Sequence, residues 1–305
     1  MPALFSLALF QNTLRTATPI VLASLGVLLT DHVGMMNIGM EGMMLTGAFF
    51  AVVGSFYLGS WVGGLLCAIL AGLALGLFFG LFVIKLHSDE FIIGVALNIF
   101  AGGLTVFLLR TLFGVKGSFA GPGIVPLPKL SWPFLHKIPV IGPLLNDNTL
   151  LVYGSWVLVF ACWVLLYKTP LGFWLRAAGE HPESLRSAGL NPDKMKFIAS
   201  TLCGVFAGLS GAHLSLGYLT LFTENMSASR GFIAVACVIF GASNPPLVFM
   251  AALLFGFIDA AGVRLQSYGI NSFLTALSPY AATVAMMVIV VLRKQWLARK
   301  RAVSR

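Results

Sequence analysis

The chain has 305 residues, of which 58% are hydrophobic and only 10% are charged, and its mean hydropathy is +0.94. Soluble domains carry about a quarter charged residues, so this composition excludes a soluble globular protein. It predicts an all-α polytopic membrane protein. The formal net charge of +9 requires no nucleic acid as a partner, because Lys and Arg collect on the cytoplasmic loops of membrane proteins.

Apolar runs predict about nine transmembrane helices, with a range of about eight to ten, in a single transmembrane domain that covers residues 1–305. The range stays open because residues 31–57 could form one helix or two half-helices. The expected spans are residues 3–29, 31–57, 61–84, 91–113, 149–167, 197–220, 232–243, 246–267 and 272–292.

Two of these spans carry signs of contact with other helices. The first half of the first span contains Gln11, Asn12 and Arg15. Polar groups are costly in lipid, so we expect this half to face other helices or water. In the third span, glycines recur at every fourth position from residue 72 to residue 80. Small residues on one helix face predict close packing against a neighbouring helix.

The four cysteines lie in apolar runs and have no partner at metal-ligand spacing: Cys67, Cys162, Cys203 and Cys237. We expect small buried hydrophobic residues rather than disulfides or a metal site. The scattered acids and the five histidines form no clustered set, so we predict no catalytic residues and no metal site. The N-terminus lacks a basic start, and we expect no cleavable signal peptide.

Residues 31–57 are interrupted by glycines and carry Asn37 and Glu41 within or beside apolar sequence. Glycine-broken segments with such polar groups are typical of substrate sites in transporters. A buried charge is costly, so Glu41 needs a specific partner. Two roles are open for Glu41: it bonds backbone N–H groups of a broken helix, or it contacts the substrate. Asn98 lies inside the span 91–113. Its side chain either makes a hydrogen bond that supports helix packing or lines the pore.

A short sequence similarity links the two halves of the chain. The segment Asn37-Ile-Gly-Met-Glu-Gly in the first half is similar to Asn225-Met-Ser-Ala-Ser-Arg-Gly in the second. Each segment precedes an apolar helix rich in small residues. This pattern predicts two weak structural repeats with a site between them.

Two segments between spans differ in character. Residues 114–149 are rich in proline and glycine, contain no apolar run long enough to span, and predict a long exterior loop. Residues 169–196 are the most charged long segment and predict an aqueous loop with a short helix. Pro182 suits the first helical position and Glu183 the first turn, while Gly189 can stop the helix. On this chemistry alone, the segment is either a docking element or a solvated connection.

The basic residues predict the orientation in the membrane. The tail at residues 293–305 carries six Lys or Arg and no acid, the segment 168–196 carries five, and Lys85 adds one. With about nine spans, all three regions fall on one side, which is the cytoplasm. The N-terminus and the proline-rich loop then face outward, whereas an even number of spans would place the N-terminus inside.

Three sequence blocks, in this order, resemble the permease subunits of bacterial ATP-binding-cassette (ABC) importers. The match is to the nucleoside and simple-sugar branch, which is related to the ribose and branched-chain amino acid permeases. The blocks are VGMMNIGMEGMMLTGAF at residues 33–49, TPLGFWLRAAGEHPESLRSAGLNPDKMK at 169–196 and SRGFIAVACVIFGASNPP at 229–246. The pattern covers nearly the whole chain.

The resemblance implies a non-catalytic subunit that forms the translocation path in the bacterial inner membrane, with a cytoplasmic C-terminus. Its implied partners are an ABC ATPase, a second permease in a heterodimer, and an extracytoplasmic binding protein, either a lipoprotein or a periplasmic protein. The sequence contains no G-x-x-x-x-G-K-[ST] phosphate loop. ATP and Mg²⁺ are therefore expected on the ATPase, with no cofactor in this chain.

The resemblance also implies two sets of functional residues. Residues 182–190 are expected to form the coupling helix that seats in the ATPase. For ATPase coupling we expect Arg176, Glu180, Pro182, Glu183, Arg186 and Gly189. For the substrate path we expect Asn37, Glu41, Asn98, Glu224 and Asn225.

Three other functions fit parts of the pattern. The same machinery could carry a pentose or a branched-chain amino acid. An ion-coupled secondary transporter could use Glu41 or Asp259 as its titrating group. Asp259 and Arg264 share one predicted span and are spaced for a loose pairing or for partners on other helices. A membrane-embedded enzyme would need clustered catalytic groups at one depth, which the sequence does not indicate.

Overall fold

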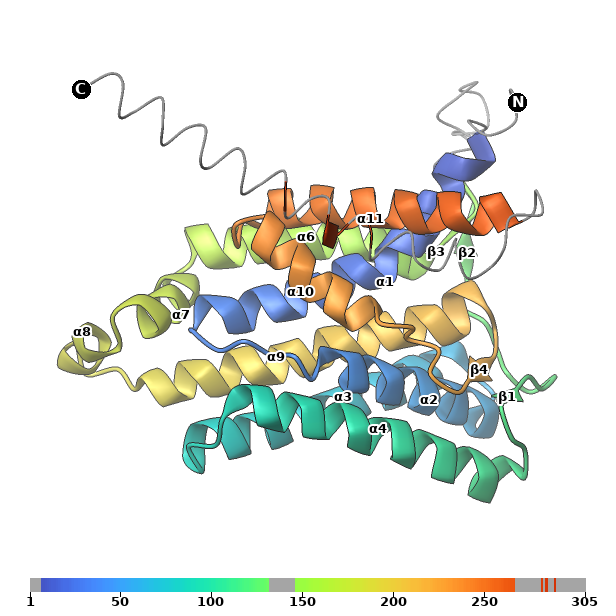
Figure 1. Cartoon of the computed structure of the whole chain (residues 1–305), viewed down its shortest axis with the longest axis horizontal. Helices are drawn as coiled ribbons and strands as arrows, with labels where there is room; N and C mark the ends of the chain where they lie inside the picture. The colour runs from blue at the N-terminus through green and yellow to red at the C-terminus, as the bar shows by residue number, and fades with distance from the viewer. Residues whose placement is uncertain (1–6, 132–145, 267–280, 282, 285–287, 289–305) are drawn as a thin grey trace.

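The computed structural model describes residues 7–131 and 146–266, together with the isolated positions 281, 283, 284 and 288. The described residues form a bundle of helices that run along the long axis of Figure 1. Seven of these helices are long and apolar enough to cross a membrane. The predicted all-α, multi-pass fold is therefore confirmed. The predicted span 272–292 and the basic tail 293–305 lie outside the two described ranges.

Six of the seven candidate spans match predicted ones within about five residues at each end, whereas α2 (Met40–Leu58) begins nine residues later than the predicted span 31–57. The seven are α1 (Leu7–His32), α2, α3 (Trp61–Gly80) with its π-helical extension η1 (Leu81–Lys85), α4 (Glu90–Phe113), α6 (Leu150–Lys168), α9 (Pro192–Ala212) with the π-helical η3 (His213–Tyr218), and α11 (Pro245–Gln266). Three shorter helices complete the described part: α7 (Pro170–Glu180), α8 (Pro182–Ser187) and α10 (Arg230–Phe240).

The count of about nine spans is not confirmed, because one predicted span is too short. The apolar run expected at residues 232–243 forms α10, which has 11 residues. At a rise of about 1.5 Å per residue this helix is about 16 Å long, roughly half of a bilayer core. The backbone leaves the helix at Gly241, and Ala242 and Ser243 adopt left-handed conformations with φ of 47° and 54°. The chain then returns as α11.

The polar first helix lies inside the bundle. Most of α1 is buried, with α9, α10 and α11 packed around it. Gln11 donates a hydrogen bond to the carbonyl of Asn146 at 3.2 Å, and Arg15 donates to the carbonyl of Asp147 at 3.0 Å. The expectation that these two side chains face other parts of the protein is confirmed, whereas Asn12 is exposed.

The glycine ladder of α3 packs against α9. A side chain at Gly72 would collide with the carbonyl oxygen of Gly204, and one at Gly76 would lie 2.5 Å from the carbonyl oxygen of Ser200. The Ser200 hydroxyl donates to the carbonyl of Gly76 at 2.6 Å, across the same seam. The predicted close packing is confirmed, because glycine alone lets the two backbones approach to this distance.

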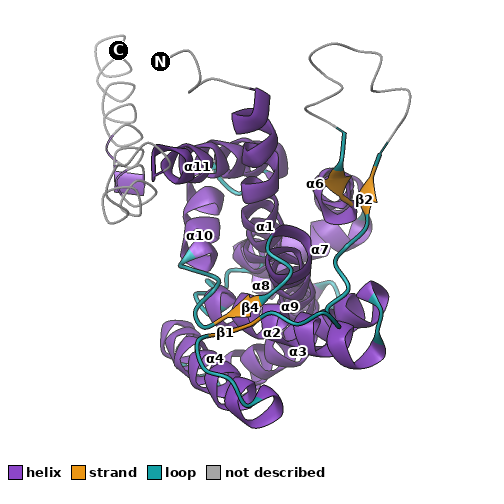
Figure 2. Cartoon of the chain, turned by 90° about the vertical axis from the view of Figure 1, so that its right-hand side faces the viewer, coloured by secondary structure: helices purple, strands orange, loops and turns teal. Residues whose placement is uncertain are grey.

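The two ends of the bundle are different. At one end, β1 (Ser118–Phe119) pairs with β4 (Phe222–Thr223), and β2 (Lys129–Leu130) pairs with β3 (Asn148–Thr149), both antiparallel. Figure 2 views the molecule from this strand end. At the opposite end, α7 and α8 connect α6 to α9 (Figure 1). The predicted proline-rich loop and the predicted charged loop therefore lie at opposite ends, as a membrane topology requires.

Candidate functional site

Two interrupted helices meet inside the bundle, and Glu41 joins them. After α1 the chain runs without helix to Met40, where α2 begins, and after β4 it turns back into the bundle before α10 begins at Arg230 (Figure 1). The Oε1 atom of Glu41 accepts a hydrogen bond from the backbone N–H of Ser229 at 2.7 Å, and Oε2 accepts one from Gly231 at 2.7 Å. One carboxylate therefore holds the starts of both helices together.

This contact satisfies groups that would otherwise be costly in a membrane. The first N–H groups of a helix have no partner within the helix, and the helix dipole favours an anion beside them. Glu41 is 8% exposed, so its charge is compensated by these N–H groups rather than by water. The sequence left two roles open for Glu41, and these contacts show the first, a bond to backbone N–H groups of a broken helix. Contact with the substrate stays a prediction.

The local backbone at the start of α10 explains the residue types there. Ser229 adopts a left-handed conformation with φ of 64°, which turns its N–H toward Glu41. A side-chain carbon at Gly231 would lie 2.5 Å from the backbone nitrogen of Glu41. Only glycine therefore allows α2 and α10 to approach this closely.

Two amides support the interrupted stretch before α2. Asn37 is fully buried, accepts a hydrogen bond from the N–H of Gly39 at 2.9 Å and donates to the sulfur of Cys203 at 3.2 Å. Asn98 accepts from the N–H of Gly42 at 2.7 Å and donates to the carbonyl of Ile38 at 3.1 Å. The side chains of Asn37 and Asn98 thus hold the backbone around Glu41. Cys67, Cys162, Cys203 and Cys237 are all free; the last three are buried, as expected, whereas Cys67 is only partly buried.

The two similar sequence segments, residues 37–42 and 225–231, come together at this contact. Each precedes a helix that starts inside the bundle, and the two helices run in opposite directions: α2 toward the strand end and α10 toward the α8 end (Figure 1). Helix starts that meet in opposed directions inside a bundle are typical of transporter sites built from inverted repeats.

The other two predicted path residues lie nearer the strand end. The carboxylate of Glu224 accepts a hydrogen bond from the N–H of Gly117 at 3.0 Å, beside the β1–β4 pair. Asn225 follows in a left-handed conformation with φ of 58°. The structure therefore brings Asn37, Glu41 and Asn98 to one place but not Glu224.

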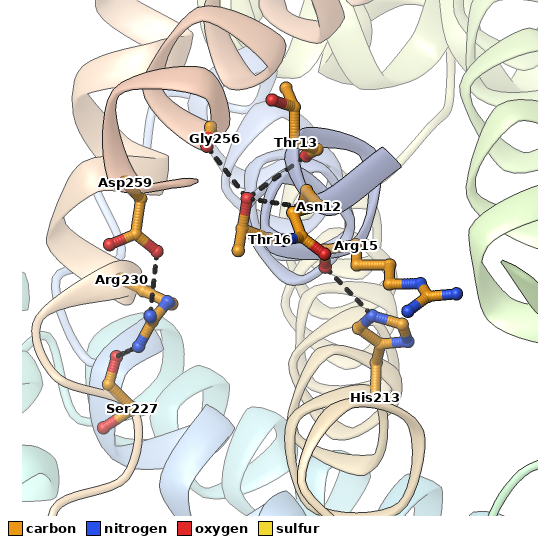
Figure 3. Close-up of polar contacts among 9 residues, drawn as sticks. All are labelled: Asn12, Thr13, Arg15, Thr16, His213, Ser227, Arg230, Gly256 and Asp259. Carbon is orange, nitrogen blue, oxygen red and sulfur yellow. Dashed lines mark hydrogen bonds and ion pairs between the residues drawn. The ribbon is translucent and has the colours of Figure 1, made fainter. Parts of the chain in front are cut away.

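An ion pair that was not predicted from the sequence joins Arg230 and Asp259. The Nη2 atom of Arg230 lies 2.9 Å from Oδ2 of Asp259, and the two side chains are 18% and 20% exposed (Figure 3). Arg230 is the first residue of α10 and Asp259 lies within α11. Of the two roles left open for Asp259, a partner on another helix is the one observed. The available signal was a lone acid inside an apolar span, which predicts a buried partner.

A second polar group lies on the other side of α1. His213 is fully buried, and one of its ring nitrogens lies 3.4 Å from Oγ1 of Thr149. The other lies 3.2 Å from the carbonyl oxygen of Arg15 (Figure 3). Nearby, a hollow of about 470 Å³ opens at the strand end, with Arg15, Lys129 and Tyr218 among its lining residues. Two basic side chains therefore line part of a hollow whose wall is otherwise mostly apolar.

The charged segment forms two helices rather than the single short helix expected. α7 extends to Glu180, and α8 begins at Pro182, in the predicted first position. Within α8, Glu183 and Arg186 form an exposed ion pair at 3.0 Å. Gly189 follows the helix with φ of +80°, as predicted for the residue that stops it. The guanidinium of Arg176, on α7, lies 5.0 Å from the centre of the Tyr167 ring.

The charged segment also contacts the interrupted stretch before α2. Gly179 of α7 packs on the turn that follows α1, where a side chain at Gly179 would collide with the carbonyl oxygen of His32 and lie 2.9 Å from the nitrogen of Gly34. At the same end of the bundle, the hydroxyl of Ser243 bonds the carboxylate of Asp31. The end of α1 therefore touches both α7 and the turn between α10 and α11.

Comparison with known proteins agrees with a permease built on interrupted membrane helices. Residues 9–292 match the family described as branched-chain amino acid transport system / permease component, and the chain belongs to this family. It is 33% identical over 261 residues to the guanosine ABC transporter permease NupQ of Bacillus subtilis, a match that covers 82% of this chain and 80% of NupQ. It is 28% identical over 271 residues to a second guanosine permease of that bacterium, NupP, covering 83% of this chain and 73% of NupP.

Two further proteins extend the comparison. A Haloferax volcanii protein with the provisional name of a glucose ABC transporter permease is 32% identical over 320 residues, covering 95% of this chain and 94% of that protein. A solved ABC transporter, described as of metal-chelate type and in an inward-facing conformation, has a similar fold with a TM-score of 0.54, covering 91% of this chain and 84% of that one. Its sequence identity is 16%, so this likeness concerns the fold alone.

Proposed function

We propose that this chain is a transmembrane subunit of an ABC importer and that it forms part of the translocation path for a nucleoside or a simple sugar. The observation that carries the proposal is α8, a largely exposed helix at the far end of the bundle (Figure 1). Pro182 starts it and Gly189 stops it, so its length is fixed. A rigid helix outside the spans, packed through α7 onto the end of α1, suits docking to a partner that moves.

The partner that docks at α8 is an ABC ATPase, which binds ATP and Mg²⁺ and hydrolyses the nucleotide. The chain itself is a non-catalytic permease and holds no cofactor, in keeping with the lack of a phosphate-loop motif in its sequence. The α8 end then faces the cytoplasm of a bacterial cell and the strand end faces outward. This orientation agrees with the five basic residues at positions 168–196.

A second permease completes the path. The guanosine permeases NupP and NupQ come from one bacterium, and this chain is similar to both but more so to NupQ. This supports a heterodimer in which the chain takes the NupQ-like place. An extracytoplasmic binding protein delivers the substrate at the strand end, where the hollow lined by Arg15, Lys129 and Tyr218 opens.

The coupling mechanism follows from the contacts between α7, α1 and α2. Closure of the ATPase pair moves α8, and the tight packing of Gly179 on the turn at His32 transmits this motion to the interrupted stretch. Because Glu41 bonds both helix starts, α2 and α10 respond together. The membrane half then switches between outward-open and inward-open arrangements.

The proposal assigns two sets of residues. Those for coupling are Arg176, Glu180, Pro182, Glu183, Arg186 and Gly189. Those for the path include Asn37, Glu41, Asn98, Glu224 and Asn225.

The proposed cargo follows the named relatives rather than the family description. The family takes its name from branched-chain amino acid transport, but the relatives compared above are named for guanosine and for glucose. A nucleoside and a simple sugar share a hydroxylated ring, and an amino acid lacks one.

The test is reconstitution of the chain with its ATPase, its second permease and its binding protein in proteoliposomes. We expect all four chains to co-purify in detergent, and uptake of guanosine or glucose to require ATP. Uptake by this chain alone, without ATP, would instead identify a secondary transporter.

A further inference from the structure

The ion pair between Arg230 and Asp259 is an unusual feature for the interior of a membrane protein. Asp259 lies about 21 Å along α11 from Pro245 at a rise of about 1.5 Å per residue, so it is well inside the span. Charged groups at this depth are costly, and they face a protein interior or a water-filled path rather than lipid. The pair retains 18% and 20% side-chain exposure, so it is not sealed inside the protein.

The hydrogen-bonding capacity around the pair is not filled. The Nε atom of Arg230 and the hydroxyl of Ser227 are both buried and have no hydrogen-bond partner among the residues that the structure describes. The Nη1 atom of Arg230 reaches the carbonyl of Ser227 only at 3.4 Å, a long contact (Figure 3). Of the two Asp259 carboxylate oxygens, Oδ2 receives the one hydrogen bond found for this side chain within the described ranges. Unfilled donors and acceptors beside a charge pair can take up polar groups of a ligand.

The pair also lies beside the contact between α2 and α10. Arg230 is the residue between Ser229 and Gly231, whose backbone N–H groups Glu41 holds. A solute that passes this contact therefore passes close to Arg230 and Asp259.

We propose that Arg230 and Asp259 bind the adjacent hydroxyl groups of the substrate ring during its passage. A carboxylate accepts hydrogen bonds from two neighbouring hydroxyl groups, and a guanidinium donates to their oxygen atoms. A ring with a vicinal diol is the part that a ribonucleoside and a hexose have in common. The inference rests on the proposed function and adds to it the residues that recognise this group.

The test compares the uptake of two ligands by the complete reconstituted transporter. One is the cargo, guanosine or glucose, whichever the wild type takes up, and the other is its analogue without the vicinal hydroxyl pair. The ratio of their kcat/KM values is measured for the wild type, for Asp259→Asn and for a double Arg230→Leu/Asp259→Leu variant. Because the binding protein is the same throughout, a change in this ratio comes from the permease.

We expect both variants to reduce the preference for the diol-bearing ligand by about tenfold or more, the effect of losing one hydrogen bond to a charged group. The loss should lie mainly in transport of the diol-bearing ligand, with transport of the analogue little changed. Lys116→Gln, an exposed change near β1, is the control and should keep the wild-type ratio. Asp259→Asn preserves side-chain shape, and the double variant leaves no lone buried charge, so at least one of them is expected to fold.

The outcomes separate the two proposals. If the variants transport both ligands with the wild-type ratio, the ion pair only supports the fold and the inference is wrong, while the proposed function stands. If the wild-type complex takes up neither guanosine nor glucose, the proposed cargo is wrong and the inference falls with it.

Discussion

The carboxylate of Glu41 and the backbone nitrogen of Gly231 lie 2.7 Å apart, although 190 positions separate the two residues in the chain. A second bond of 2.7 Å joins the same carboxylate to the N–H of Ser229. Hydrogen bonds to a charged acceptor are stronger than neutral ones, and few competing partners exist inside a membrane. The starts of α2 and α10 therefore either move together or separate only by breaking two strong bonds.

Glu41→Gln tests the structural importance of this contact. Glutamine keeps one acceptor oxygen but presents an NH₂ group to the second backbone N–H, so one bond is lost and one donor is left unpaired. We expect the free energy of unfolding to fall by about 2–3 kcal/mol, the value typical of a hydrogen bond to a charged group. Thermal melting in detergent measures the change.

The matched control is Glu183→Gln, which also lies in the first turn of a helix but has a side chain that is 81% exposed. We expect its stability to stay within about 0.5 kcal/mol of the wild type. Equal melting of the two variants would contradict the structural role of Glu41. Unchanged uptake rate and selectivity in Glu41→Gln would remove this residue from the substrate path.

The seam between α3 and α9 gives a second prediction. A methyl group at Gly72 would collide with the backbone of Gly204, and main-chain atoms cannot move aside as a flexible side chain can. We expect Gly72→Ala to lower stability by about 1–3 kcal/mol, the usual cost of overpacking. Gly103→Ala on α4 is the control, since, apart from the backbone of its own helix and its two chain neighbours, nothing lies within 4 Å of the position that its new carbon would take. Melting curves of equal midpoint for both variants would show that the helices can separate at little cost.

Arg186→Glu tests the docking of α8. The ion pair between Arg186 and Glu183 is exposed at 56% and 81%, so it adds at most about 1 kcal/mol and its loss should not unfold the chain. If α8 seats in the ATPase, charge reversal should weaken that interface by about 1–2 kcal/mol and lower substrate-stimulated ATP hydrolysis about tenfold. Lys116→Glu at the strand end should leave hydrolysis unchanged. Intact assembly and intact coupled hydrolysis in Arg186→Glu would show that α8 is not the coupling helix.

The sequence predicted most spans because a run of about twenty apolar residues has few alternatives to a membrane helix. It was wrong for residues 232–243, where the apolar run joins a polar turn and the true length of α10 depends on where that turn begins. The need for a partner at Glu41 was visible from the cost of a buried charge. Backbone N–H groups were one of its two predicted partners, but their positions at Ser229 and Gly231 were not predicted, because backbone N–H groups carry no residue-type signal. Arg230 was missed as a site residue because it follows a polar linker, where a basic residue usually faces water.

Gly179 gives the prediction that bears most directly on coupling. Its backbone packs on the turn between His32 and Gly34, where Gly34 adopts a left-handed φ of +73°. A methyl group at Gly179 would force α7 away from this turn, and overpacking of this kind costs about 1–3 kcal/mol. The distortion lies between α8 and the interrupted stretch that leads to α2. We therefore expect Gly179→Ala to keep binding the ATPase while its ATP hydrolysis no longer depends on substrate and its uptake per ATP falls.

Gly154→Ala on α6 provides the comparison, because nothing lies within 4 Å of its added carbon apart from the backbone of its own helix and its two chain neighbours. Its uptake per ATP should equal that of the wild type. The two quantities to measure are ATP hydrolysis and uptake on the same proteoliposomes, since their ratio separates lost coupling from lost protein. If Gly179→Ala folds and retains the wild-type ratio, the motion of α8 reaches the membrane helices by another route. The contact between Asp31 and Ser243, at the same end of α1, is then the next link to test.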